Sequence, residues 1–160
     1  MFSIDDDAEF SSPNIVSHTL KEFDDDRIAI IAVPFIDVNI SPDTIRQLSS
    51  DSSTCLIAPS FVGTAHALRR ETFLAVGGYR PFLFHQGEEE DLSIRLLDRG
   101  CYVRLGSSAP IYHYVSPIRD NRRLHVYGPR NQILFAWHNV PTRYLPAQLM
   151  GTTAGVMPVS

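Results

Sequence analysis

Hydrophobic residues along this chain form short apolar runs that alternate with segments of helical periodicity. The runs Met1–Ile4, Arg27–Phe35 and Leu56–Ala67 have the character of strands. The second of them reads RIAIIAVPF, and such a continuous apolar run is typical of a strand buried on both faces. Apolar residues recur at helical spacing in Asn14–Phe23 and Arg69–Val76. The pattern therefore predicts strands separated by helices.

The stretch from Gly77 to His113 has the most informative order of residues. Four carboxylates occupy positions 88–91, a helical pattern follows them, and Gly100 is placed to end that helix. A β-like run, Tyr102–Tyr114, then delivers the histidine. We expect the last clear helix at about residues 130–138, started by a proline and with the only tryptophan in the core.

The composition bounds the class of protein. With 160 residues, 44% of them hydrophobic and 20% charged, the chain is long enough for one soluble domain with a hydrophobic core. Residues 1–53 carry a net charge of −8 and residues 54–160 a net charge of +4. Because nucleic-acid-binding domains are usually basic overall, the total of −4 argues against a nucleic-acid partner.

Neither the cysteines nor the apolar segments indicate export or membrane insertion. Cys55 and Cys101 are predicted to be small buried thiols in a reducing compartment. Acidic residues begin at Asp5, unlike a secretory signal. No apolar run reaches the about 20 residues of a membrane helix. We therefore expect a cytoplasmic protein.

Carboxylates follow the first predicted strand directly. Asp5, Asp6 and Asp7 come after Ile4, at the edge of a sheet where α/β proteins bind ligands. Two carboxylates one residue apart can share a hard divalent cation such as Mg²⁺ or Mn²⁺. An Asp-rich turn without a metal is the alternative interpretation. The second triplet, residues 24–26, is predicted to be a solvated loop rather than another metal site.

The acidic cluster at residues 88–91 also has two interpretations. Carboxylates at a helix N-terminus are favoured by the helix dipole, so the cluster could be only a solvated helix start. Crowding of like charges, however, raises the pKa of one member, which suits a general base. The residues alone leave both interpretations open.

The order of these motifs resembles the second half of the catalytic domain of family 2 glycosyltransferases. The resemblance covers nearly everything from Ile4 to about Asn139. It is carried by a glycine–glycine–aromatic turn, an acidic cluster that ends in Asp-Leu, an Arg-Leu pair, a glycine and a later histidine. These are Gly77-Gly78-Tyr79, Glu88 to Leu92, Arg95-Leu96, Gly100 and His113.

The resemblance implies an α/β fold, namely a partial GT-A fold with a mixed sheet flanked by helices. It implies an inverting, metal-dependent transfer of a sugar from a nucleotide-sugar donor to an acceptor hydroxyl. Asp5 and Asp7 match the D-x-D motif, and His113 would complete the shell of a Mg²⁺ or Mn²⁺ ion. The catalytic residues would be Glu89 as the base, with Glu88 and Asp91 beside it. Glu89 stands where the family usually has Asp.

The resemblance also implies a donor site and partners. The acceptor would be a saccharide or a lipid-linked molecule, with peripheral association at the inner face of a membrane. The donor-binding candidates are Asp6, Gly63, Thr64, Arg122 and Arg130. The alternative interpretation of Gly63 and Thr64 is plain sheet packing, and that of the arginines is a solvated loop.

One departure from the family pattern concerns the start of the chain. The family places a nucleotide-binding half before D-x-D, whereas only four residues precede Asp5 here. We therefore expect a fragment, with residues 1–140 as a partial catalytic domain and 141–160 as a tail. Weak donor binding and self-association through an exposed sheet edge would follow. The alternative functions are a non-catalytic degenerate transferase and a metal-dependent phosphohydrolase.

Overall fold

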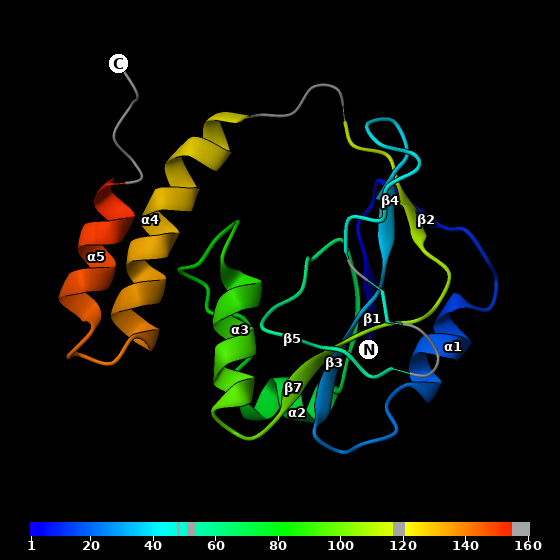
Figure 1. The fold of residues 1–160 in the computed structure, drawn as a ribbon, viewed down its shortest axis with the longest axis horizontal. Helices are drawn as coiled ribbons and strands as arrows, with labels where there is room; N and C mark the ends of the chain where they lie inside the picture. The colour runs from blue at the N-terminus through cyan, green and yellow to red at the C-terminus, as the bar shows by residue number, and fades with distance from the viewer. Residues whose placement is uncertain (48, 51–53, 117–120, 155–160) are drawn as a thin grey trace.

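The computed structural model describes residues 1–47, 49–50, 54–116 and 121–154, and the side chains of these except 121–125 and 152–154. Within this part, groups of two or four strands alternate with one or two helices (Figure 1). The strands are β1 (Phe2–Ile4), β2 (Ala8–Phe10), β3 (Ile28–Ala32), β4 (Phe35–Asp37), β5 (Ile57–Ala58), β6 (Ala65–Leu68), β7 (Tyr102–Leu105) and β8 (Ile111–His113). The helices are α1 (Ile15–Lys21), α2 (Arg70–Ala75), α3 (Glu88–Leu97), α4 (Asn121–Asn139) and α5 (Leu145–Ala154).

The main sheet has the strand order β1-β6-β3-β7-β5 among the described residues. The central strand β3 pairs antiparallel with β6 and parallel with β7, so the sheet is mixed. All five residues of β3 are buried, as expected for a strand flanked on both sides. Strand β1 lies at one edge of this sheet, in agreement with the expected edge strand.

A second, three-stranded mixed sheet has the order β2-β8-β4. Two predicted strands are divided between the sheets. The apolar run Arg27–Phe35 splits into β3 and β4 at Pro34, because proline has no N–H for the ladder. The run Tyr102–Tyr114 likewise splits into β7 and β8. The division carries the chain from the main sheet to the second sheet twice.

Helix α3 is placed by a glycine at each end. Gly87 has φ +87° immediately before the helix, and Gly100 has φ +74° just beyond it, a conformation that favours glycine. Leu92 and Leu96 are fully buried against the main sheet, whereas Leu97 is exposed. The predicted helix and its end are confirmed.

The C-terminal helices differ from the sequence prediction. Helix α4 extends over Asn121–Asn139 with Pro129 inside it, so the expected start at about residue 130 is wrong. Trp137 is 66% exposed, which contradicts the expected core position. Helix α4 lies between α3 and α5 (Figure 1). The proposed division at residue 140 stays a prediction.

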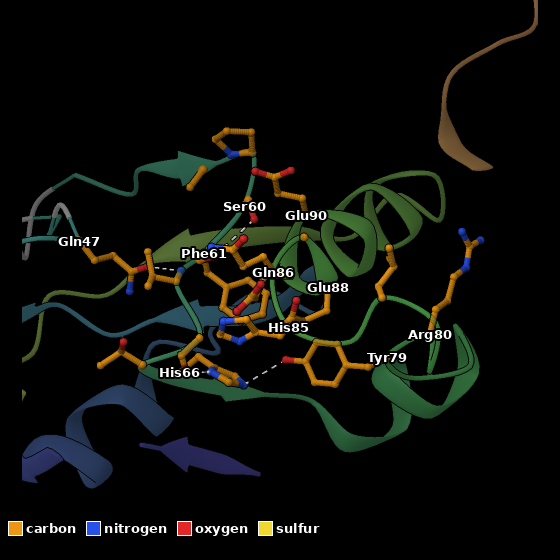
Figure 2. Close-up of a pocket in the computed structure, with 18 of the residues that line it drawn as sticks. Gln47, Ser60, Phe61, His66, Tyr79, Arg80, His85, Gln86, Glu88 and Glu90 are labelled. Atoms are coloured by element: carbon orange, nitrogen blue, oxygen red, sulfur yellow. Dashed lines mark hydrogen bonds between the residues drawn. The ribbon is translucent and has the colours of Figure 1, made fainter. Parts of the chain in front are cut away.

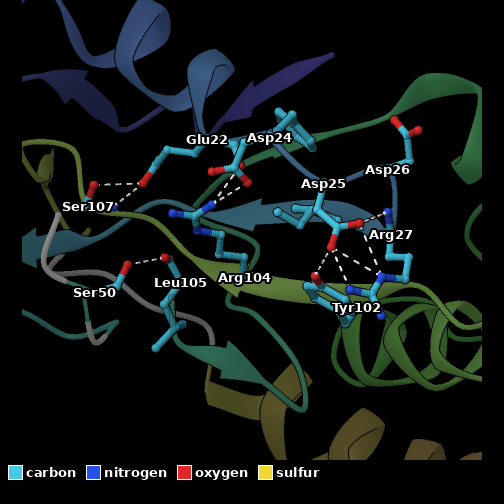
Figure 3. Close-up of polar contacts among 12 residues, drawn as sticks. Glu22, Asp24, Asp25, Asp26, Arg27, Ser50, Tyr102, Arg104, Leu105 and Ser107 are labelled. Atoms are coloured by element: carbon cyan, nitrogen blue, oxygen red, sulfur yellow. Dashed lines mark hydrogen bonds and ion pairs between the residues drawn. The ribbon is translucent and has the colours of Figure 1, made fainter. Parts of the chain in front are cut away.

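The loop from α1 to β3 is held by ion pairs (Figure 3). Asp25 accepts hydrogen bonds from Arg27 and from the Tyr102 hydroxyl. Asp24 pairs with Arg104 at 2.9 Å. The expected solvated loop is confirmed, because Asp24 and Asp26 are exposed and Asp25 is half-buried, and the ion pairs of this loop lie at the surface.

Two further observations concern the thiols and the helices. Cys55 is exposed and Cys101 is half-buried, so the prediction of two buried thiols is wrong. In the described part of the chain, no helix combines the length and the apolar character needed to cross a membrane.

Candidate functional site

The structure brings together the three predicted metal ligands. Asp5 and Asp7 lie in the turn between β1 and β2, and β2 pairs with β8 so that Ala8 is opposite His113. The Tyr114 N–H donates to the Asp7 carbonyl at 2.9 Å, which fixes the turn against the end of β8. One ligand atom from each of Asp5, Asp7 and His113 lies within 4.8 Å of the others.

His113 has a polar partner on each side of its ring. Its Nδ1 lies 2.7 Å from Asp37 Oδ1, and its Nε2 lies 3.2 Å from Asp7 Oδ1. Asp37 also accepts a hydrogen bond from Arg46 Nε at 2.8 Å. Burial acts to raise the Asp37 pKa, but the hydrogen bonds from Arg46 and His113 outweigh it and lower that pKa. Asp37 is thus kept as a carboxylate beside the imidazole.

This donor set fits a divalent cation. Carboxylate oxygens suit Mg²⁺ and Mn²⁺, and a neutral imidazole can ligate through Nε2. Three protein ligands leave coordination positions for water or phosphate oxygens. Asp5, Asp7 and His113 are the residues that would hold such an ion; which ion they prefer stays a prediction.

Glu89 is the second functional group of the site, after the candidate metal ligands. It lies in the first turn of α3 and is half-buried. Its pKa is raised to about 7, mainly by burial and by the charge of Glu88, although the backbone N–H of Gly63 acts in the opposite direction. A carboxylate with a pKa near neutrality can both take up and release a proton at physiological pH.

Two consecutive residues lie between Glu89 and the candidate metal ligands. A Cβ on Gly63 would lie only 2.5 Å from Glu89 Oε1, so the glycine leaves room for that carboxylate. The next residue, Thr64, accepts a hydrogen bond at its carbonyl from the Asp5 N–H at 3.0 Å. The segment Gly63–Thr64 therefore has the base candidate on one side and a metal ligand on the other.

Asp5, the segment Gly63–Thr64 and Glu89 line one cleft of about 1250 Å³ (Figure 2). A ligand-binding site for a small molecule usually has several hundred Å³, so this cleft can hold a nucleotide sugar. The predicted residues in its wall are Asp5, Gly63, Thr64, Glu88 and Glu89. The sequence alone did not show that they share a cavity.

His66 and Tyr79 add a neutral hydrogen-bonding pair to the cleft (Figure 2). His66 Nδ1 lies 3.1 Å from the Gly63 carbonyl, and its Nε2 lies 3.5 Å from the Tyr79 hydroxyl. Burial lowers the His66 pKa, whereas burial, Glu89 and Glu88 raise the Tyr79 pKa. Sequence reasoning missed His66, because a histidine inside an apolar strand carries no local signal.

Asp91 occupies a different environment from Glu89. Its side chain is fully buried and pairs with Arg80 at 2.9 Å and with Arg95 at 2.8 Å. Asn139 donates to the same carboxylate at 2.9 Å. Arg95 also donates to the carbonyls of Val76 and Gly78. These contacts join α3 to the Gly77-Gly78 turn and to α4, and they place Asp91 outside the residues that line the cleft.

The loop before α3 has an unusual backbone conformation, and the buried side chain of Asn131 holds it in place; this contact is called the Asn131 clamp below. His85 and Gln86 have φ values of 61° and 77°, and both residues line the cleft. Asn131 of α4 is 1% exposed, and its side-chain amide donates to the carbonyls of Phe84, His85 and Gln86 at 3.4, 3.0 and 2.6 Å. Such backbone strain persists only where the surroundings hold it. Sequence reasoning missed this clamp.

The other donor-binding candidates have no cleft contact in the described part of the chain. Asp6 is exposed between the candidate metal ligands Asp5 and Asp7. Arg130 donates to the Phe82 carbonyl and to Asn131 Oδ1 and does not line the cleft. The Arg122 side chain falls outside the described residues. Donor binding by these three residues stays a prediction.

Comparisons with known proteins identify a similar fold. No protein-family model matches the sequence, and no curated protein matches it. The solved structure of a mannosyltransferase from Pyrobaculum calidifontis, in complex with GDP-Man and Mn²⁺, is similar with a TM-score of 0.60 and 13% identity. The match covers 97% of this chain and 44% of the mannosyltransferase chain. At this identity the likeness concerns the fold: the chain has a mixed α/β, glycosyltransferase-like fold, consistent with the predicted partial GT-A fold.

Proposed function

We propose that this chain carries the metal and base sites of a glycosyltransferase, which transfers a sugar from a nucleotide-sugar donor to an acceptor hydroxyl. One observation carries the proposal. The segment Gly63–Thr64 lies between Glu89 and Asp5, which line the same cleft, and Asp7 and His113 lie next to Asp5. Sugar transfer needs this combination, because charge develops on the leaving diphosphate while the acceptor loses a proton.

Each set of residues has a defined task in this reaction. Asp5, Asp7 and His113 would hold the divalent cation, which neutralises the leaving diphosphate when it is bound. Glu89 accepts the proton of the acceptor hydroxyl. The acceptor oxygen forms a bond to the anomeric carbon, and the bond from that carbon to the phosphate oxygen breaks, its electron pair leaving with the diphosphate. A single displacement of this kind inverts the anomeric centre.

The neighbouring chemistry supports the assignment of the base to Glu89. Asp91 is fully buried and held by two arginines, so its oxygens are committed to ion pairs. Glu88 lines the cleft, and its charge helps to raise the Glu89 pKa to about 7. Asp91 is then an anchor of α3, and Glu88 is a neighbour that tunes the base.

The solved neighbour suggests the first ligands to test. That mannosyltransferase was solved with GDP-Man and Mn²⁺, and we propose the same class of donor and ion for this chain. The family 2 assignment and the saccharide or lipid-linked acceptor rest on the sequence resemblance. On the same basis we propose that the protein acts in the cytoplasm at a membrane surface and that it self-associates through β1.

Calorimetry on the 160-residue chain tests the proposal. We expect Mn²⁺ to bind and GDP-mannose to bind more tightly when Mn²⁺ is present. Asp7→Asn should weaken Mn²⁺ binding, whereas Asp26→Asn, which changes a fully exposed acid, should not. Equal Mn²⁺ affinity in the wild type and Asp7→Asn would refute the metal site. Metal-dependent release of phosphate from a simple phosphate ester would favour a phosphohydrolase instead.

A further inference from the structure

The second sheet places a carboxylate directly behind the imidazole of His113. Strands β4 and β8 are parallel, and Asp37 is the register partner of His113. The Val38 N–H donates to the His113 carbonyl at 3.0 Å, which holds the two strand ends together. The Asp37 side chain is only 10% exposed. Its position is therefore set by the sheet and not by a mobile loop.

The ring of His113 lies closer to Asp37, at 2.7 Å from Nδ1, than to Asp7, at 3.2 Å from Nε2, so the Asp37 contact has the stronger influence on the tautomer. Asp37 Oδ1 lies 2.7 Å from His113 Nδ1, so a carboxylate there accepts a hydrogen bond only if Nδ1 carries the proton. In that neutral tautomer Nε2 has a free lone pair, and Nε2 is the nitrogen on the side of Asp7. The opposite tautomer would put hydrogen on Nε2, which then cannot ligate a metal.

Two further contacts hold this pair in place. Arg46 Nε donates to Asp37 Oδ2 at 2.8 Å, and the Arg46 backbone N–H donates to the Phe35 carbonyl at 2.9 Å. The Phe35 ring meets the His113 ring edge-on, with centroids 5.9 Å apart. The carboxylate is thus fixed by an arginine on one side, and the imidazole is fixed by an aromatic ring on the other.

We propose that Asp37 and Arg46 are positioning residues for the metal site: Asp37 selects the Nδ1–H tautomer of His113, and Arg46 fixes Asp37. This inference rests on the proposed metal site. A carboxylate that accepts the second N–H of a ligating histidine orients the ring and makes it a better ligand, and its loss typically weakens metal binding about 10- to 100-fold. Neither residue touches the ion.

Titration with Mn²⁺ alone tests the inference without any need for turnover. The electron paramagnetic resonance signal of free Mn²⁺ gives the dissociation constant directly. We expect Asp37→Leu to weaken binding about 10- to 100-fold. Asp37→Asn should lose less, because its amide oxygen can still accept from Nδ1–H. Asp43→Asn changes an exposed acid in the segment between Asp37 and Arg46 and should bind Mn²⁺ like the wild type.

A spectroscopic readout separates positioning from a general loss of structure. Long-range proton–nitrogen correlation spectra of the metal-free chain report which nitrogen of His113 carries the proton. The wild type and Asp37→Asn should show the Nδ1–H form, and Asp37→Leu should show a mixture. If Asp37→Leu does not fold, Arg46→Gln replaces it, with a smaller loss of Mn²⁺ affinity expected.

The outcomes distinguish this inference from the proposed function. Unchanged Mn²⁺ affinity in a folded Asp37→Leu variant would overturn the inference and leave the metal site intact. A wild type with mainly Nε2–H would overturn it as well. A wild type that binds no Mn²⁺ would remove the metal site, and the inference with it.

Discussion

Replacing Glu89 by glutamine should make the protein more stable and abolish the proposed sugar transfer. The pKa of Glu89 is raised from 4.5 to about 7, mainly by burial and then by Glu88. Below the unfolded-state pKa of Glu89, this side chain is neutral in both the folded and the unfolded chain, and the stability that its neutral form contributes is fully present. As the pH rises through about 7, that contribution is lost, because the charged carboxylate is better solvated in the unfolded chain. Glutamine carries no charge at any pH and avoids this loss.

The size of the effect follows from the pKa. A change of one pKa unit corresponds to about 1.4 kcal/mol, so a rise from 4.5 to about 7 gives at most about 3 kcal/mol at pH 8. Solvent around a half-buried carboxylate reduces this value. We therefore expect Glu89→Gln to be more stable by about 1–3 kcal/mol at pH 8 and nearly equal to the wild type at pH 4.

Urea unfolding at pH 4 and pH 8, followed by circular dichroism, measures both differences. Glu71→Gln, which changes an exposed glutamate in the first turn of α2, is the matched control and should show no comparable gain. Metal-dependent turnover of the nucleotide sugar should be lost in Glu89→Gln only. A glutamine variant that is no more stable than the wild type at pH 8 would refute the assignment of Glu89 as a destabilised, functional carboxylate.

Two further substitutions test the walls of the cleft. Gly63→Ala should change the free energy of unfolding by less than about 1 kcal/mol but reduce turnover about 10- to 100-fold, because the new Cβ displaces the Glu89 carboxylate. The control is Gly151→Ala, since a Cβ at this position on α5 meets no other atom. Unchanged turnover in Gly63→Ala would contradict the contact with Glu89. Asn131→Ala should lower the free energy of unfolding by about 1–3 kcal/mol and make the loop before α3 sensitive to protease. The control, Gln132→Ala, changes an exposed residue and should do neither. Equal protease sensitivity of the two variants would contradict the role of Asn131 in holding the loop.

The local elements of the fold were predictable because their signals lie within short windows. The apolar run of β3, the glycine that ends α3 and the acidic turn after β1 were all readable from neighbouring residues. The break at Pro34 could also have been read, since proline cannot continue a buried ladder. Pro129 misled the prediction in the opposite direction. A proline marks a helix start more often than a helix interior, yet α4 continues through it.

The site was predictable only where residues follow strand ends. Asp5, Asp7 and His113 follow or end strands, and the structure brings them together. Asp37 carries the same signal, an acid at the end of a short apolar strand, but the polar segment after it obscured the strand. Asn131 and His66 had no local signal at all. Their roles come from contacts across many residues of the chain, which a single sequence does not display.

The clamp between α4 and the loop before α3 has a consequence for the order of folding during synthesis. Asn131 and its partner carbonyls are separated by about 45 positions, and Asn139 reaches back 48 positions to Asp91. A ribosome releases the strands and α3 well before α4, and domains fold from the N-terminal side as the chain emerges. The sheets can therefore form while the helix that carries Glu89 still lacks its outer support. The loop before α3 would reach its final backbone conformation last, when α4 has left the exit tunnel and Asn131 can donate to the loop carbonyls.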